Sequence, residues 1–191
     1  MNVYKTKYSL KKHFLNFFAK NIHMVIGNMY FRLYDPVKDV IVKNYNDEDW
    51  RKILSNITED DFKDLFTCSN VVILIWCDLA TDTPHGMLYF EENYNCPFEV
   101  LFHGGTWDHN PKYYREIFRS IVHVFDFMLN FKTIISTTCG IDNARADKFQ
   151  NSLCFEEIKR DELVKYKVLN KQNFSESSFV NKLRLVTRKE D

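Results

Sequence analysis

The stretch "CGIDNARADKFQNSLCFEE", residues 139–157, decides the fold because it contains a strand end, a turn, a short helix and the start of another strand. Asn143 stands where the helix would begin, and asparagine is one of the residues preferred at a helix N-cap. Ala146 follows three positions later, Phe149 six and Phe155 twelve. We therefore expect a helix over 143–152 that Asn143 caps and that leads directly into a strand.

Hydrophobic periodicity extends this pattern outward into a mixed domain. "NPKYYREIFRSIVHVFDFMLN", 110–130, predicts the longest helix, with Pro111 in its first turn and an apolar stripe along one side. "VVILIWCDLA", 71–80, predicts a strand buried on both faces. Further helices are expected at 5–24 and 46–66, further strands at 29–34, 39–45, 85–93, 98–107 and 132–139, and a bent strand or hairpin at 155–170. This order predicts an α/β (α+β) fold, with a mixed, mostly antiparallel sheet and helices on both faces.

Three regions are expected along the chain. Residues 1–28 predict an amphipathic helix that packs on the domain and stops at Gly27-Asn28, with a membrane-surface or partner helix as the alternative. Residues 29–170 form the domain itself. Residues 171–191 predict a polar, partly loose tail, in which "FVNKLRL", 179–185, is the segment expected to dock.

Composition excludes several classes of function. Lys plus Arg equals Asp plus Glu at 26 each, so no net field attracts nucleic acid or an anionic membrane. The longest apolar run, 71–76, is far shorter than the roughly 20 residues that span a bilayer. Five cysteines without close pairs favour a reducing, cytoplasmic compartment. No Cys and His spacing typical of a zinc site is present, so no metal is expected.

The residues of the opening stretch, together with the element order, resemble the GNAT superfamily of N-acetyltransferases. The matching positions are Asn143, Ala146, Phe149 and the run Leu153-Cys154-Phe155, and the residue-level match covers 132–156. The resemblance implies acetyl-coenzyme A as acyl donor and direct attack by a primary amine in a ternary complex. It also implies that Asn143 and Ala146 lie beside the pantetheine arm, where a small side chain lets the arm pass, and that Phe155 anchors the next strand in the core.

The pyrophosphate-binding loop departs from the family. "GGTWDHNPKYY", 104–114, stands where the family has Arg/Gln-x-x-Gly-x-Gly/Ala, a loop whose consecutive N–H groups hold the pyrophosphate at a helix N-terminus. Gly104 and Gly105 fall on the strand side of this loop. Lys112 and Arg115 are the candidates to neutralise a phosphate.

The strand at 98–107 carries the candidates for proton transfer. Glu99, Leu101 and His103 alternate onto one face, and a carboxylate or imidazole there could accept a proton from an acceptor amine. His103 precedes Gly104-Gly105, which permit a bulge and a close backbone approach. The resemblance implies a splay at this strand that lets a backbone N–H bond the thioester carbonyl. A purely structural histidine is the alternative for His103.

Two further departures keep a second function open. Phe149 replaces the tyrosine that in many relatives protonates the leaving thiolate. Cys154 replaces the glycine that commonly ends such a helix, so the helix must end differently or carry strain. The two candidate functions are an N-acyltransferase and a catalytically inactive GNAT-like binding or structural module. A homodimer and a monomer are both open.

Overall fold

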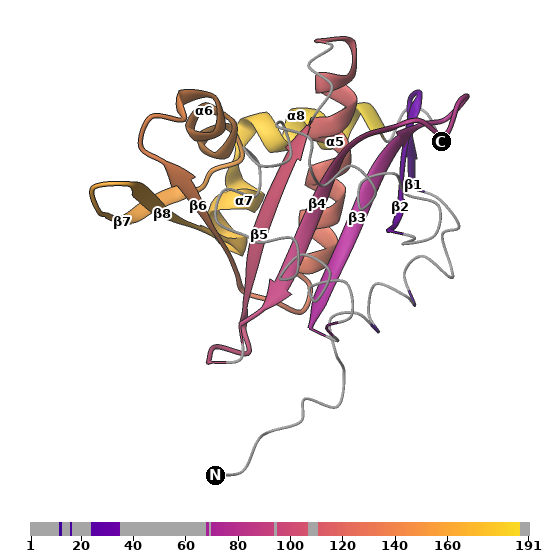
Figure 1. Cartoon of the computed structure of the whole chain (residues 1–191). Helices are drawn as coiled ribbons and strands as arrows, with labels where there is room; N and C mark the ends of the chain where they lie inside the picture. Colours follow the sequence, from indigo (N-terminus) through magenta and orange to yellow (C-terminus); the bar gives the residue numbers. More distant parts are fainter. Residues whose placement is uncertain are drawn as a thin grey trace. The chain divides into compact units, whose positions relative to one another are not determined.

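The computed structural model describes residues 12, 16, 24–34, 68, 70–93, 95–106 and 111–187 (Figure 1). They belong to two compact units, one made of residues 1–91 and 104–109, the other of residues 92–103 and 110–191. The predicted strand 39–45 and the predicted helices over 46–66 lie outside the described residues. Of the predicted helix 5–24, Lys12 and Asn16 are helical. The domain bounds drawn from the sequence stay predictions.

In the residues that the structure describes, the first unit contains four antiparallel strands in the order β1-β2-β3-β4. They are β1 Met24–Ile26, β2 Met29–Leu33, β3 Val71–Asp78 and β4 Pro84–Glu92. Every residue of β3 from Val71 to Cys77 is buried, which confirms the prediction of a strand buried on both faces. Phe31 of β2 meets Trp76 of β3 edge to face, with the ring centroids 5.7 Å apart.

The expected role of Gly27-Asn28 is wrong. These two residues do not stop a helix but join β1 to β2, in a register that pairs Ile26 with Met29. Gly27 has a φ of 60°, a left-handed conformation that glycine adopts without steric cost and that tight hairpins require. A Gly-Asn pair is compatible with both a helix end and a hairpin, so the sequence alone did not distinguish them.

The described part of the second unit has four strands, in the order β5-β6-β8-β7, and four helices. Its elements are β5 Glu99–Thr106, α5 Pro111–Met128, β6 Ile134–Gly140, α6 Ala144–Ser152, β7 Glu156–Arg160, β8 Val164–Asn170, α7 Lys171–Glu176 and α8 Ser178–Thr187. The residues of β5 from 104 to 106 belong to the first unit. β5 and β6 are parallel, whereas β8 is antiparallel to both β6 and β7. The predicted mixed, mostly antiparallel sheet is confirmed, and 155–170 is the hairpin.

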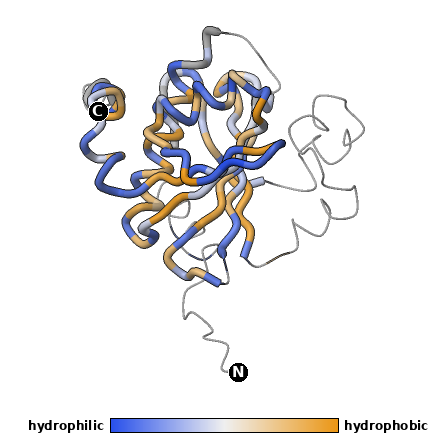
Figure 2. Tube along the Cα trace, turned by 90° about the vertical axis from the view of Figure 1, so that its left-hand side faces the viewer, coloured by the Kyte–Doolittle hydropathy of each residue, from blue (hydrophilic) through white to orange (hydrophobic). Residues whose placement is uncertain are grey.

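The core of the second unit is aromatic. Phe102 of β5 lies edge-on to Phe125 of α5 at 5.0 Å between centroids and stacks on Phe155 at 6.2 Å. Phe125 also contacts Phe174 of α7 at 5.9 Å. Phe155 is 4% exposed, so its predicted anchoring role is confirmed. Figure 2 shows hydrophobic stretches of the described chain interrupted by hydrophilic positions.

Two helices occupy the region where a polar, partly loose tail was expected. α7 begins at Asn170, whose side chain accepts the N–H of Asn173 at 2.8 Å. Val180 and Leu183 of α8 are buried, and Arg184 donates to both carboxylate oxygens of Asp126 on α5. The expected docking of 179–185 is thus confirmed, because an apolar stripe and an ion pair hold this segment on α5.

Helices α5 and α6 lie over the same face of the second unit's strands. Val100 pairs with Ile135 and Ile135 with Leu169, so their side chains share the face of Phe102, which contacts α5. Thr137, two residues after Ile135, points to that face too and is bonded by α6. The predicted helices over 46–66 lie outside the described residues, so the prediction of helices on both faces is tested here for α5 and α6 alone.

β7 is the outermost strand of this unit and is exposed at all five residues. Its pairing with β8 passes from Glu157–Lys167 to Lys159–Tyr166. Ile158 is therefore an extra residue, a β-bulge in the outer strand.

Candidate functional site

The pairing between the parallel strands β5 and β6 is short. Their registered pairs are Glu99–Ile134, Val100–Ile135 and Leu101–Ser136, whereas β6 stays paired with β8 as far as Gly140–Val164. The pairing of the two strands therefore ends at the Leu101–Ser136 pair. The splay that the family resemblance implies beyond this pair stays a prediction.

The helix after β6 begins as predicted. The side chain of Asn143 accepts the N–H of Ala146 at 3.0 Å, and its main-chain oxygen accepts the N–H of Asp147 at 3.0 Å. Asn143 is exposed and Ala146 half-buried. The predicted cap is confirmed, and the small side chain of Ala146 lies in the first turn of α6.

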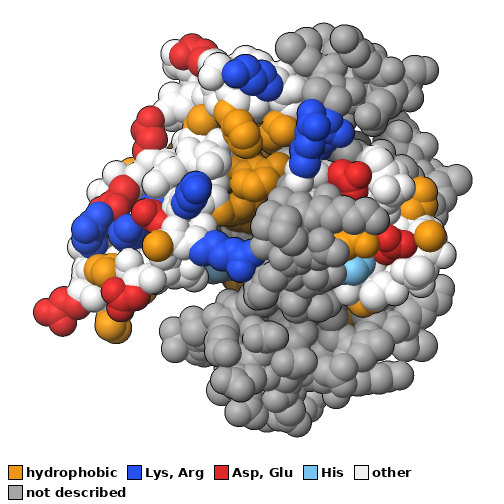
Figure 3. All heavy atoms as spheres, turned by 90° about the horizontal axis from the view of Figure 1, so that it is seen from above, with side chains coloured by type: hydrophobic (Ala, Val, Ile, Leu, Met, Phe, Trp, Pro, Cys, Tyr) orange, Lys and Arg blue, Asp and Glu red, His pale blue; other side chains and the backbone are white. Residues whose placement is uncertain are grey.

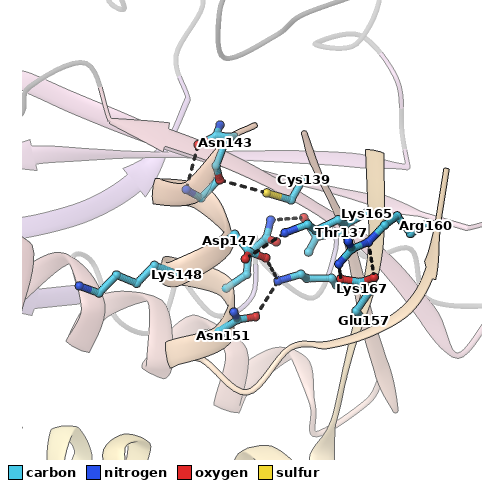
Figure 4. A network of polar contacts seen from close by, with 12 residues as sticks. Thr137, Cys139, Asn143, Asp147, Lys148, Asn151, Glu157, Arg160, Lys165 and Lys167 are labelled. Atoms are coloured by element: carbon cyan, nitrogen blue, oxygen red, sulfur yellow. Dashed lines mark hydrogen bonds and ion pairs between the residues drawn. The ribbon is translucent and has the colours of Figure 1, made fainter. Parts of the chain in front are cut away.

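A polar network joins α6 to β8 (Figure 4). Asp147 lies between two lysines of β8, bonding Lys167 through one carboxylate oxygen and Lys165 through the other at 3.1 Å. Lys167 also donates to Asn151, one turn further along α6, at 2.6 Å. These bonds from Lys167 and then Lys165 hold the pKa of Asp147 below its usual value. The side chain of Lys167 is 1% exposed, so its ammonium group is buried against this carboxylate.

Cys139 sits beside the network but is no nucleophile. It is 3% exposed, and its thiol lies 3.5 Å from the main-chain oxygen of Asn143. Burial, and then the charge of Asp147, raise the pKa of this thiol. Cys139 shares the α6 face with Thr137, whereas His103 alternates onto the face opposite Phe102, so the two do not form a thiol–imidazole dyad.

The C-terminus of α6 carries a strained residue. Cys154 has a φ of 68°, the left-handed conformation in which glycine usually stands. Its N–H bonds the oxygen of Asn151 at 3.0 Å, and the N–H of Phe155 bonds that of Gln150 at 3.1 Å. These two bonds are those of a Schellman motif. The helix thus ends in the usual way and carries the strain that glycine would have avoided.

We expect Cys154→Gly to stabilise the protein. A residue with a Cβ destabilises the folded state by roughly 1–2 kcal/mol in the left-handed conformation. Glycine removes this strain, but it also raises the conformational entropy of the unfolded chain, which offsets up to about 1 kcal/mol of the gain. A net gain of about 0.5–1 kcal/mol should raise the melting temperature by about 2 °C. Cys154→Ala is the control, because alanine keeps the Cβ. Equal melting temperatures for the glycine and alanine variants would rule out backbone strain as the cause.

Phe149 is a packed aromatic. Its half-buried ring lies 4.9 Å from that of Phe118 on α5, and Phe118 in turn meets Phe179 of α8 at 5.7 Å. A phenyl ring has no proton to donate, so any leaving group here must be protonated by another residue or by water.

The two candidates for proton transfer are half-buried on the other face of β5. Glu99 accepts a hydrogen bond from the amide nitrogen of Asn93 at 2.6 Å. Burial lowers the pKa of His103 from its ordinary 6.5, so its imidazole is neutral at pH 7 and can accept a proton. Their roles stay predictions.

The residues proposed for phosphate binding are only partly described. Gly104 is exposed and Gly105 half-buried, in the first unit. Arg115 is exposed on α5 of the second unit. The side chain of Lys112 and residues 107–110 lie outside the described residues. A phosphate role for these positions remains a prediction.

Charges around the described surface are mixed in sign. In Figure 3 acidic and basic side chains alternate on the left-hand part of the face. Among the described residues, no three His, Cys, Asp or Glu side chains gather closely enough to hold a metal ion. None of the helices in the described ranges is both long and apolar enough to cross a membrane. All five cysteines are free thiols.

Several solved structures that resemble this chain in fold are described as acetyltransferases. No model of a known protein family matches the chain, and no curated protein matches it. Spermidine N-acetyltransferase from Vibrio cholerae, solved with CoA and spermine, superposes with a TM-score of 0.62 at 15% identity, over 78% of this chain and 99% of that one. Aminoglycoside acetyltransferase AAC(6')-Ib, solved with coenzyme A and kanamycin, gives 0.61 at 13% identity, over 78% and 98%.

The description of a third similar structure includes the name of the fold family. FdhC, described as a nucleotide-linked sugar GNAT and solved in its apo form, gives a TM-score of 0.61 at 15% identity, over 84% of this chain and 94% of that one. The chain therefore has a fold of the mixed α+β class that it shares with these structures. The particular fold is that of the GNAT superfamily, which confirms the fold implied by the opening stretch.

Sequence reasoning missed the lysines and the aspartate of the network. Asp147 and Lys167 are 20 positions apart, and nothing local indicates that they meet. One signal was available, since Lys165 and Lys167 recur with the period of a strand and so project to one face.

Proposed function

We propose that the chain is an acetyl-CoA-dependent N-acyltransferase that acts on a primary amine in a ternary complex. The observation that carries this proposal is that the pairing of β5 with β6 ends at Leu101–Ser136, in a unit whose next helix is capped by Asn143. A pantetheine chain is narrow, and in this proposal it passes the end of that pairing and the small side chain of Ala146. The residues present therefore fit the cofactor.

Each predicted site residue has a role in this proposal. Asn143 and Ala146 border the pantetheine arm, and Gly104 and Gly105 allow the close backbone approach that phosphates need. Lys112 and Arg115 supply positive charge for those phosphates. Acetyl-coenzyme A, when bound, supplies the acyl group as a thioester.

In this proposal His103 accepts the proton from the acceptor amine. An amine with a pKa near ~10.4 is almost wholly protonated at pH 7, and only its neutral form attacks a carbonyl. His103, neutral because burial lowers its pKa, accepts the proton at an imidazole nitrogen, directly or through water. Glu99, which is held by Asn93, is the second candidate on the same face.

The acceptor class rests on the chemistry of the fold neighbours. Two of them were solved with spermine and kanamycin, both of which carry primary amines. We therefore propose a small amine as acceptor. A cytoplasmic location and a homodimer stay predictions that accompany this function.

One observation favours the second candidate, a GNAT-like module without catalysis. Phe149 packs on Phe118 where many relatives have a proton-donating tyrosine. A calorimetric or thermal-shift titration with acetyl-coenzyme A separates the two. A concentration about 100 times the dissociation constant should stabilise the folded chain by about 2.7 kcal/mol, and no shift at millimolar cofactor would end the acyltransferase proposal.

Ala146→Phe should abolish coenzyme A binding while the protein stays folded. A phenyl group at this half-buried position would occupy the space through which the pantetheine arm is proposed to pass. Ala144→Phe is the matched control, because it adds the same ring to an exposed position of the same helix. Affinity should fall by more than about 10²-fold, or about 2.7 kcal/mol, in the first variant only. Parental affinity in Ala146→Phe would show that the arm does not pass there.

A further inference from the structure

Helix α6 is attached to the sheet by polar bonds more than by apolar packing. Its sequence is ARADKFQNS, and its single fully buried residue is Gln150. Gln150 donates to the main-chain oxygen of Thr138 at 3.0 Å. Phe149 is directed to α5 rather than to the strands. A helix that buries so little apolar surface gains little from the hydrophobic effect.

Asp147 makes the strongest of these polar attachments. It lies on the first full turn of α6, one position after Ala146, and bonds two lysines of β8. Hydrogen bonds between charged partners are roughly twice as strong as neutral ones. Lys167, 1% exposed in its side chain, would be a buried charge without its carboxylate partner if Asp147 were neutral, and such a state is strongly unfavourable.

The network also fixes the direction of the helix, because it holds α6 at two levels. Lys167 bonds Asp147 and also Asn151, one turn later, at 2.6 Å. Lys165 approaches the second oxygen of Asp147. Figure 4 shows both lysines pointing from β8 toward the helix, whereas Lys148 points away from them. Two contacts one turn apart prevent α6 from sliding and from rotating about its axis.

We infer that Asp147 is a positioning residue, which through Lys165 and Lys167 holds α6 so that Asn143 and Ala146 border the cofactor site. The inference rests on the proposed function for its link to coenzyme A, but its structural part is independent of the cofactor. Asp147 itself touches no substrate in this account. Loss of its charge moves or loosens the helix that carries the two bordering residues.

The test compares Asp147→Asn with Asp126→Asn. Asp126 forms another ion pair in this unit, to Arg184, and belongs to no proposed site. Both variants should lose melting temperature. Hydrogen exchange of the α6 amides, residues 144–152, should quicken at least tenfold in Asp147→Asn and stay at the parental rate in Asp126→Asn. The affinity for coenzyme A should fall roughly tenfold, about 1.4 kcal/mol, in Asp147→Asn only.

Two more variants test whether the charge of Asp147 positions α6. Asp147→Glu keeps the charge and should recover most of the affinity and exchange protection. Lys165→Gln removes the more exposed of the two cations and should give a smaller loss of coenzyme A affinity and of exchange protection. It replaces Asp147→Asn as the test if that variant does not fold. Unchanged α6 exchange in Asp147→Asn or Lys165→Gln would overturn the inference. A parent that binds no coenzyme A would instead overturn the proposed function, while the exchange rates would still decide the role of Asp147.

Discussion

His103→Ala should lower turnover by roughly 10²-fold while leaving the affinity for coenzyme A nearly unchanged. A positioned general base contributes about 10²–10⁴-fold. A contact made mainly in the transition state does not support binding of the ground state. The parent's rate should fall on the acid side, with an apparent pKa below 6.5, because burial lowers the pKa of His103. This fall in rate on the acid side should be absent from His103→Ala. His123→Ala, which changes a half-buried histidine on α5, is the control.

The structural alternative for His103 predicts a different pH response. The folded-state pKa of His103 lies below its unfolded value, so on acidification the unfolded chain binds the proton first. The folded state of the parent therefore loses stability as the pH falls from about 6.5 through the lowered pKa. His103→Ala should lack this loss in either case. If the variant keeps parental turnover and the parental pH–rate profile and changes only the pH dependence of melting, His103 is structural.

Gly86→Ala should cause the largest loss of stability among the variants considered. A Cβ on Gly86 would lie 2.2 Å from Cζ2 of Trp76 and 2.6 Å from the main-chain oxygen of Gly105. Trp76 is 2% exposed, so its ring has little room to move. Overpacking of this kind costs typically 1–3 kcal/mol and sometimes more. We expect about 3 kcal/mol, which corresponds to a fall of about 6–12 °C in melting temperature.

Gly140→Ala is the matched control for this prediction. Its added Cβ would meet only the Cβ of Asn143, at 3.8 Å, which is ordinary van der Waals contact. Gly140 also lies in a strand, β6, so both substitutions change strand glycines. The control should melt within about 2 °C of the parent, given that surface changes stay within about ±0.5 kcal/mol. A Gly86→Ala variant that melts like the control would show that Trp76 moves aside.

Local signals predicted the parts of the fold that local chemistry determines. The cap at Asn143 was readable because an asparagine side chain bonds a backbone N–H three residues later. The face of His103 was readable because strands alternate. The helices α7 and α8 carried comparable signals, namely Asn170 at a cap and the spacing of Phe174, Val180 and Leu183, but the abundance of polar residues around them hid the pattern.

Long-range contacts were beyond sequence reasoning. Nothing in the chain near Asp147 indicates which of the many lysines approaches it, since that depends on how β8 pairs with β6. The same limit applies to Gly86, whose closeness to Trp76 and Gly105 follows from packing rather than from its neighbours in sequence. The strain at Cys154 was foreseen only as one of two options, because the backbone angle decides between them.

The bulge at Ile158 has a consequence for solubility. An outer strand with free backbone groups is a template on which another chain can add a strand, and long flat apolar edges promote fibrous aggregation. β7 is five residues long, carries two acidic and two basic side chains around a 64% exposed isoleucine, and is bent by the extra residue. A kinked, charged strand cannot extend its hydrogen-bond ladder to a flat neighbour. The chain can thus expose a hydrophobic residue at the rim of its sheet and still resist sheet-to-sheet growth at high concentration.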